Sequence, residues 1–197
     1  RFTKSGTTCR NLNMSDLKIS LPQVMESDRL RLRAFTPEDI QANYVAWLND
    51  PQVVQFSNQR FHKHSEASCS QYLASFAHTD NRFLAIEDKL THELKGTLTM
   101  YINPHHQTAD VGILIGNTNH WGKGYGYEAF ALAVESLLKT KLRKVTAGTM
   151  ACNLGMVKLM EKCGMTLEAT RKAHEILDGQ AVDLLYFAKF SKSFEGP

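Results

Sequence analysis

The sequence predicts one α/β domain of the α+β kind, with a mixed, mostly antiparallel central sheet of about seven strands and about four flanking helices. Residues 83–115 hold three strand-like segments with no helix between them, which indicates an antiparallel meander. Residues 117–164 then show helix, strand and helix patterns in turn. The last two strand segments flank Asp178-Gly179, a strong hairpin signal.

The N-terminal part predicts one strand and two helices. Residues 29–35 alternate basic and apolar side chains, which is typical of a half-buried strand. The residues from Thr36 to Asp39 combine an N-cap residue, a proline and two acids, which favours a helix start. We expect this helix to end before Pro51, and a second helix to begin at Ser65 after an irregular connection over 53–64. The apolar face of the first helix comprises Ile40, Tyr44, Trp47 and Leu48.

In the central and C-terminal parts, the spacing of apolar residues and the positions of glycines predict the strands and helices. Residues 83–87, 94–102 and 111–115 predict the strands of the meander, and Gly112 inside the last of them suggests a bulge or a close backbone approach. Next come a helix with one apolar face after Gly126, a strand over Lys144–Met150 and a helix over Asn153–Cys163 that Gly164 stops. The closing hairpin spans residues 165–190.

Composition excludes several classes of protein. The chain has 197 residues, of which 43% are hydrophobic and 22% charged, so it can form a packed core and is not predicted to be disordered. The longest apolar run, Ala129–Val134, is far too short to span a membrane. The net charge of +3 comes from Arg1, Lys4 and Arg10, so residues 14–197 are formally neutral. We therefore expect no nucleic-acid partner and no membrane partner.

The first thirteen residues are polar and lack periodicity, and we expect a disordered leader or expression remnant over 1–13 before a single domain over 14–197. They show no apolar segment of a secretory signal. The four cysteines have no zinc-like spacing, so we expect no metal site and free thiols in a reducing, cytoplasmic setting. The histidine pairs at His62 and His64 and at His105 and His106 lack further ligands and are expected to be loop residues.

A glycine-rich segment carries the strongest chemical signal. Gly122, Gly124 and Gly126 occupy alternate positions where a predicted helix begins directly after a strand and a short loop. Glycine allows the backbone to approach a ligand closely, and a helix N-terminus offers free N–H donors and a positive dipole end. This combination suits a phosphate or pyrophosphate, although such glycines can also serve tight packing alone. The Walker ending is absent, and Tyr127 breaks the dinucleotide pattern.

The segment from Trp121 to Ala129 resembles the acetyl-CoA pyrophosphate loop of the GNAT superfamily of N-acetyltransferases, with Trp in place of the usual Gln or Arg. Two further segments resemble the same family. They are Asn153 with Glu161 to Met165, and Trp47 to Pro51, which is typical of the acceptor-side helix in the branch of Rim-type ribosomal-protein N-terminal acetyltransferases. The resemblance covers roughly residues 28–190, and the element order agrees with it.

The resemblance implies direct transfer of an acetyl group from acetyl-CoA, as co-substrate, to a primary amine, with no acyl-enzyme. The strand over 111–115 would diverge from the strand over 144–150 and leave a slot for the pantetheine arm, with a backbone donor for the developing oxyanion. The cofactor-binding residues that it implies are Ile113, Leu114, Ile115, Trp121, Gly122, Lys123, Gly124, Tyr125, Gly126, Tyr127 and Asn153.

The acid and base are harder to assign from the resemblance. Met156 and Met160 stand where the family often has hydroxyl side chains, so neither can supply the usual acid. Glu175 matches an acidic residue of Rim-type enzymes and is our candidate base, but a surface glutamate would look the same. Tyr101 and Glu87 are the reserve catalytic residues. The candidate acceptor-binding residues are Trp47, Phe56 and Glu87.

The acceptor stays open between a protein N-terminus, as in Rim-type enzymes, and a small amine such as an amino sugar, polyamine or aminoglycoside. We expect a monomer or homodimer. The alternative is a non-catalytic acyl-CoA-binding module or sensor, suggested by Met156 and Met160. Measurable turnover would discriminate between these two functions.

Overall fold

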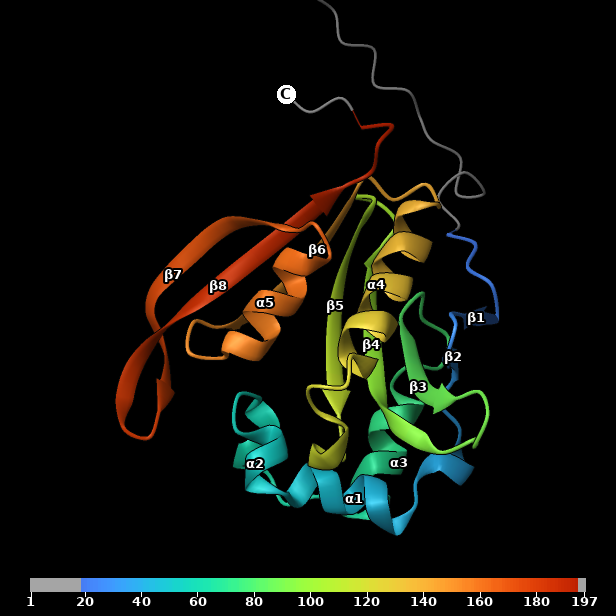
Figure 1. Ribbon diagram of the computed structural model, residues 1–197, viewed down its shortest axis with the longest axis vertical. Helices are drawn as coiled ribbons and strands as arrows, with labels where there is room; N and C mark the ends of the chain where they lie inside the picture. The colour runs from blue at the N-terminus through green and yellow to red at the C-terminus, as the bar shows by residue number, and fades with distance from the viewer. Residues whose placement is uncertain (1–18, 195–197) are drawn as a thin grey trace, which may run out of the picture.

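The computed structural model describes residues 19–194, so the predicted leader lies outside the described residues. One sheet runs through the molecule, with its helices packed on the two faces (Figure 1). The strands are β1 (Val24–Glu26), β2 (Leu30–Ala34), β3 (Arg82–Asp88), β4 (Leu94–Asn103), β5 (Thr108–Ile115), β6 (Lys144–Met150), β7 (Thr166–Leu177) and β8 (Gln180–Phe190). The α-helices are α1 (Ala42–Asn49), α2 (Pro51–Val54), α3 (Glu66–Ala74), α4 (Tyr125–Leu138) and α5 (Leu154–Lys162), and short 3-10 turns are η2 (Pro37–Asp39), η3 (Asn58–Phe61) and η4 (Thr118–His120).

The sheet has the strand order β1-β2-β3-β4-β5-β6-β8-β7. Only β5 and β6 pair in parallel, and the other neighbours are antiparallel. This confirms the mixed, mostly antiparallel sheet. The sequence analysis missed β1, a three-residue edge strand with only one buried side chain, because so short a segment shows no measurable alternation.

Two apolar cores sit on opposite faces of the sheet. The larger one packs α4 against the strands through side chains that include Leu32, Ile86, Leu98 and Phe130, all fully buried. The smaller one packs α1 and α3 against β2 and β3 and is mainly aromatic. Alternate strand residues serve opposite cores, as the period of two requires.

The helix predicted to start at Thr36 begins later. Residues 37–39 form only the turn η2, and α1 starts at Ala42. Asp39 turns back to Arg33, whose guanidinium donates to both carboxylate oxygens at 2.7 and 2.8 Å. Thr36 is the N-cap of this turn and forms a capping box with Asp39, so the predicted N-terminal signal is present but the helix does not continue from it.

The connection predicted to be irregular contains α2 and η3. Asp50 ends α1 and at the same time caps α2, because its side chain accepts a hydrogen bond from the Gln52 backbone N–H at 2.8 Å. Proline suits the first position of a helix as well as the position after one. The predicted helix start at Ser65 is confirmed, since the Ser65 side chain caps α3.

The closing hairpin is confirmed, and each of its two strands is longer than any other strand described. Asp178 and Gly179 both have positive φ angles, 49° and 77°, as a two-residue hairpin turn requires. In Figure 1 the β7–β8 hairpin extends beyond the sheet towards α2. Arg60 of η3 donates to the Ile176 carbonyl oxygen at 3.0 Å, which ties the hairpin arm to that region.

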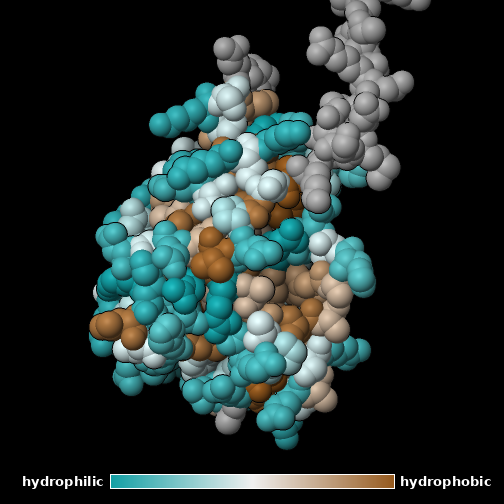
Figure 2. Space-filling view, turned by 90° about the vertical axis from the view of Figure 1, so that its right-hand side faces the viewer, coloured by the Kyte–Doolittle hydropathy of each residue, from teal (hydrophilic) through white to brown (hydrophobic). Residues whose placement is uncertain are grey.

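Hydrophilic side chains cover much of the face seen in Figure 2, with smaller groups of hydrophobic side chains between them. Among residues 19–194, none of the helices combines the length and the apolar character that a membrane crossing would need.

Candidate active site

A fork between β5 and β6 forms the centre of the site. The two parallel strands pair only from Thr108 to Asp110 on β5, although β5 continues to Ile115 and β6 to Met150. On its other edge β5 stays paired with β4 along its whole length. The edge of β5 from Val111 onwards therefore faces an opening instead of a strand, as the sequence analysis expected.

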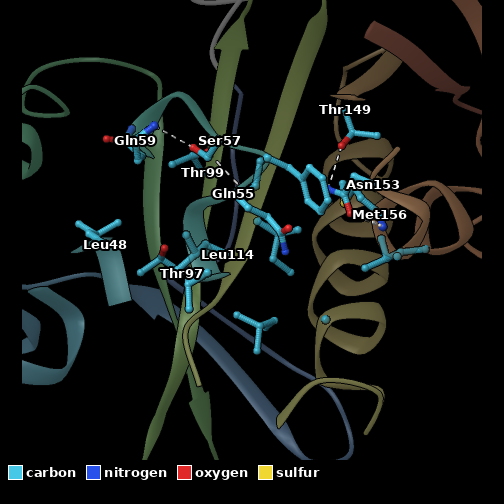
Figure 3. Close-up of a pocket in the computed structure, with 18 of the residues that line it drawn as sticks. Leu48, Gln55, Ser57, Gln59, Thr97, Thr99, Leu114, Thr149, Asn153 and Met156 are labelled. Carbon is cyan, nitrogen blue, oxygen red and sulfur yellow. Dashed lines mark hydrogen bonds between the residues drawn. The ribbon is translucent and has the colours of Figure 1, made fainter. Parts of the chain in front are cut away.

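The fork opens into a cleft of about 1270 Å³. Its walls come from β4, β5, α5, the segment from α1 to α3 and the loop before α4. Figure 3 shows Thr97, Thr99 and Leu114 on the sheet, Gln55, Ser57 and Gln59 on one side, and Asn153 and Met156 on the other. The cleft is large enough for a ligand with two distinct parts.

The glycine-rich loop forms one end of the cleft. Gly122 and Gly124 have φ angles of 72° and 85°, in the left-handed region that favours glycine. A Cβ atom at Gly122 would meet nothing within 4 Å, so the space beside this residue is open. Gly124 is the N-cap of α4, whose first N–H groups point towards the loop. Gly126 and Tyr127 also line the cleft.

Neighbouring side chains hold this loop in place. Trp121 donates from Nε1 to the Ile115 carbonyl oxygen at 3.0 Å and lines the cleft. Arg29 pairs with Glu128 at 2.7 Å and donates to the Lys123 carbonyl oxygen at 3.2 Å. Burial raises the pKa of Glu128, but hydrogen bonds from Arg29 and from Ser27 outweigh it, so the pKa is lowered and the carboxylate stays charged.

Two residues predicted to contact the cofactor lie beside the cleft and do not line it. Lys123 is exposed on the loop. Tyr125 packs between basic side chains, with the Arg29 guanidinium 4.6 Å and the Lys95 ammonium 5.3 Å from its ring. The other predicted cofactor residues all line the cleft, including Ile113, Leu114 and Ile115.

Asn153 serves as a structural cap as well as a wall of the cleft. Its side chain accepts from the Met156 backbone N–H at 3.2 Å and donates to Thr149 Oγ1 at 3.0 Å (Figure 3). These bonds fix the start of α5 next to the fork. The side chain of Met160 is fully buried in the core, while Met156 lines the cleft. A methionine side chain has no hydroxyl, so neither residue can be the proton donor.

Two tyrosines lie on the sheet side of the cleft. Tyr72 on α3 and Tyr101 on β4 join their hydroxyl groups at 2.9 Å, and both line the cleft. Burial, followed by the contact with Tyr101, raises the pKa of Tyr72 far above its ordinary value. One hydroxyl proton of the pair lies in the mutual bond, and the other is available to a ligand.

Phe56 lines the cleft, but the other two predicted acceptor-binding residues do not. Trp47 packs against Gly116, where a Cβ atom would lie 1.8 Å from the indole ring. Glu87 is 5% exposed and is held by Arg33 at 2.6 Å and by Arg31 at 3.3 Å. Their partners lie far away in sequence, so the motifs could not show that these two side chains were already engaged.

Glu175 lies on β7, outside the cleft lining. It pairs with Val182 on β8, and Val182 shares a strand face with Tyr186. Tyr186 stands opposite the cleft residue Gly148 on β6. We call the sheet face that carries Glu175, Val182 and Tyr186 the acceptor face. The register between β7 and β8 shifts between Arg171 and Glu175.

The sequence analysis did not identify the residues at the apex of the fork. Asp110 is the last β5 residue paired with β6, and its carboxylate accepts from the Thr146 hydroxyl at 2.7 Å. Burial raises the pKa of Asp110 above its ordinary value, with the Thr146 bond acting in the opposite direction. The pattern gave only one signal for it, an acidic residue inside an otherwise buried strand.

In the part of the chain that the structure describes, no group of three or more His, Cys, Asp or Glu side chains could hold a metal ion. The described cysteines, Cys69, Cys152 and Cys163, are free.

Comparison with known proteins agrees with this geometry. The model of the family described as Acetyltransferase (GNAT) domain matches residues 29–166. The probable N-acetyltransferase YjcK of Bacillus subtilis is 32% identical over 100 residues, and this match spans 49% of the chain and 52% of that protein, about half of each.

Solved structures show the same fold. The ribosomal L7/L12 acetyltransferase RimL, in complex with coenzyme A, has a TM-score of 0.76 at 18% identity and covers 90% of this chain and 100% of its own. A GNAT-family acetyltransferase of Bacillus anthracis has a TM-score of 0.74 at 19% identity, with 86% and 99% covered. The spermidine N-acetyltransferase of Vibrio cholerae, in complex with CoA and spermine, has a TM-score of 0.74 at 21% identity, with 84% and 97% covered.

Proposed function

Because the chain belongs to the GNAT acetyltransferase domain family, we propose that it is an N-acetyltransferase that moves an acetyl group from acetyl-CoA directly to a primary amine. The observation that carries this proposal is the fork between β5 and β6, with the glycine-rich loop at one end and polar side chains beyond it. Such a cleft can hold a pyrophosphate, an extended arm and an acceptor in line.

The residues present fit acetyl-CoA. Gly122 leaves open space and the N-terminus of α4 supplies unpaired N–H donors, a combination that suits a pyrophosphate. The free edge of β5 from Val111 to Ile115 offers backbone groups to the amides of a pantetheine arm. Acetyl-CoA bound in this way supplies an activated acyl group next to the acceptor.

The proton balance defines what the protein must do. A C–N bond forms and a C–S bond breaks, while the amine nitrogen loses one proton and the sulfur takes one up. An ammonium must first become neutral, and a typical side-chain amine has a pKa of ~10.4. The site therefore needs a donor near the sulfur, and either a base or an environment that disfavours the ammonium.

We assign the donor role to Tyr101. The hydroxyl of the half-buried Tyr72 can donate to the Tyr101 oxygen, which leaves the Tyr101 proton free to point into the cleft. In this role Tyr101 would protonate or hydrogen-bond the leaving sulfur, and Tyr72 would position it.

We expect Tyr101→Phe to lower kcat by ~10–100-fold with little change in the KM for acetyl-CoA, since a lost proton donor acts mainly in the transition state. Tyr72→Phe should have a smaller effect and should retain the dependence of kcat on pH. Steady-state thiol-release kinetics of the two variants measure this. An equal loss in both, with a raised KM, would point to a binding role instead.

Glu175 remains the candidate base from the resemblance, and its position on the acceptor face supports this role. Glu175→Gln is then expected to lower kcat by ~10²–10⁴-fold at neutral pH and to recover part of the rate at high pH, where the amine deprotonates unaided. Acetyl-CoA affinity, measured by calorimetry, should not change. Activity within a few-fold of the unmodified enzyme would remove Glu175 from the mechanism and leave deprotonation to solvent.

A thiol-release assay with acetyl-CoA and a panel of amines tests the proposed function. The expected result is amine-dependent release of free CoA thiol together with an acetylated product detected by mass spectrometry. The alternative, a non-catalytic acyl-CoA-binding module, follows from the two methionines at the usual hydroxyl positions. It predicts binding of acetyl-CoA with no turnover of any amine.

A further inference from the structure

The cleft has an unusual charge pattern for a site that accepts an amine. Of the cleft-lining residues in the range 19–194, none is an aspartate or a glutamate. The lysine and histidine side chains are the basic groups that line it. They are His62, Lys63, His64, His120, Lys158 and Lys162.

The basic residues fall into two groups along the cleft. Lys158 and Lys162 lie on α5, on the side of the glycine-rich loop, and the Lys162 ammonium stands 4.1 Å from the centre of the Tyr127 ring. Lys63 lies on the opposite side, in the segment between η3 and α3 that faces the acceptor. The first group suits the phosphates in the nucleotide part of acetyl-CoA. We therefore relate the second group, Lys63, to binding of the acceptor.

Lys63 belongs to a wall of mostly uncharged polar side chains. We call it the acceptor wall, and it consists of Gln52, Gln55, Ser57, Gln59, Lys63 and Ser68. Gln55 donates to the Gln52 carbonyl oxygen at 3.1 Å, and Ser57 accepts from the Gln59 backbone at 3.2 Å, so part of the wall is fixed internally. Within the described residues, the side-chain amides of Gln52 and Gln59 and the Lys63 ammonium have no protein partner. Figure 3 shows Gln55, Ser57 and Gln59 together on this side.

A polycation is a poor match for this wall. Each ammonium that enters the cleft loses water and needs a carboxylate or several acceptors in return. Residues 19–194 contribute no carboxylate to the cleft lining, and Lys63 would add repulsion. An acceptor with an anionic group gains an ion pair with Lys63, and its hydroxyls can bond the free amides of Gln52 and Gln59.

The hairpin arm lies beside the acceptor wall, although none of its residues lines the cleft. The bond from Arg60 to the Ile176 carbonyl oxygen joins η3 to β7 next to this wall. A long acceptor chain that left the cleft on this side would meet the arm, which favours a compact molecule.

We propose that the acceptor is a small, hydroxylated primary amine that carries an anionic group, either a phosphate or a carboxylate, which pairs with Lys63. This inference rests on the proposed function and narrows its substrate class. A lysine beside the amine would also disfavour its ammonium form and so lighten the task of the candidate base Glu175.

A comparison of four small amines as acceptors tests the proposal with the whole chain. The probes are glucosamine 6-phosphate, muramic acid, glucosamine and spermidine, with kcat/KM measured by thiol release at fixed ionic strength. We expect glucosamine 6-phosphate or muramic acid to exceed glucosamine by at least ~10-fold, and spermidine to be the poorest; the better of the two anionic amines identifies the anion.

Two variants that reverse the charge of a lysine test the role of Lys63. Lys63→Glu should lower the preference for the anionic amine over glucosamine by ~10-fold or more and raise the relative rate with spermidine. Lys192→Glu makes the same charge change at an exposed position after β8 and outside the cleft lining, so it should leave the preference unchanged. Thermal unfolding of both variants shows whether they are folded.

Several outcomes overturn the proposal. They are a preference for spermidine, a preference that Lys63→Glu does not change, or turnover confined to a peptide with a free N-terminus, and each of these leaves the proposed N-acetyltransferase activity standing. Binding of acetyl-CoA without turnover of any amine overturns both the acceptor class and the catalytic function. Absence of acetyl-CoA binding overturns the assignment of the cleft itself.

Discussion

Replacing Gly122 by valine is expected to weaken acetyl-CoA binding at least ~100-fold. Gly122 has a φ angle of 72°, which a β-branched side chain adopts only at a cost of about 1–3 kcal/mol. The added atoms would also occupy the open space beside the loop where we place the pyrophosphate. Calorimetric titration with CoA measures the loss, and it should be accompanied by a modest decrease in Tm.

The hairpin offers a closely matched control for this variant. Gly179 has a φ angle of 77°, and a Cβ atom there would also meet nothing within 4 Å. Gly179→Val should therefore cause similar backbone strain and a similar change in Tm, with CoA affinity unchanged. If both variants lost CoA binding equally, the effect would come from reduced stability and not from the loop.

Replacing Arg33 by methionine is expected to cause the largest loss of stability, roughly 2–4 kcal/mol or a decrease in Tm of roughly 5–15 °C. Arg33 pairs with Asp39 at 2.7 Å and with Glu87 at 2.6 Å, and both carboxylates are at least nine-tenths buried. Without the guanidinium, these two acids stay buried near each other with fewer partners. We place the value below that of fully buried pairs because Arg33 itself is 27% exposed.

The pH dependence of this loss has a definite sign. Burial alone raises the pKa of Asp39 and of Glu87, but hydrogen bonds from Arg33 and other donors outweigh it and lower both. Such groups contribute stability above the pKa of the unfolded chain, about 4, and lose it as the pH falls through the folded value. The difference between the unmodified protein and Arg33→Met should therefore shrink below about pH 4.

Removing the charges tests the cause of this loss. In the triple variant Arg33→Met, Asp39→Asn and Glu87→Gln, no carboxylate is left without its partner, so part of the lost stability should return. Chemical unfolding at several pH values measures the three proteins. A triple variant as unstable as the single one would show that Arg33 acts through packing instead of charge.

Much of the fold could be predicted because its signals are local. Asp178-Gly179 adopts the positive φ angles that its residue types favour, and Ser65 caps α3 as its position suggested. At Gly112 the pairing with β4 is regular, and a Cβ atom there would lie 2.8 Å from Thr99 Oγ1, so a side chain approaches this residue instead of the expected bulge or backbone. Each of these features depends on a few neighbouring residues or on the regular pairing of adjacent strands.

The predictions that failed depend on side-chain contacts that neither periodicity nor capping signals specify. Asp39 carries an ordinary signal for a helix N-terminus, yet Arg33 on β2 captures its carboxylate and only a turn forms there. Asp50 looked like a helix stop and is also the cap of α2. No motif could show that Trp47 fills the space left by Gly116.

In the candidate site too, one part could be predicted from the sequence and another could not. The glycine-rich loop is one continuous segment, so its pattern could be found in the sequence, and the fork was expected from the resemblance to the GNAT superfamily. The acceptor wall is assembled from α2, η3 and the start of α3, and its lack of carboxylates is a property of the folded cleft. Spacing in the sequence carries no information about such an absence.

The central claim is that the fork between β5 and β6 holds acetyl-CoA, and a crystal structure of the chain grown with CoA tests it most directly. We predict the pyrophosphate within hydrogen-bonding distance of backbone N–H groups of residues 122–126, and the pantetheine arm along the free edge of β5 from Val111 to Ile115. CoA bound elsewhere, or a fork closed by continued pairing of β5 with β6, would contradict the account.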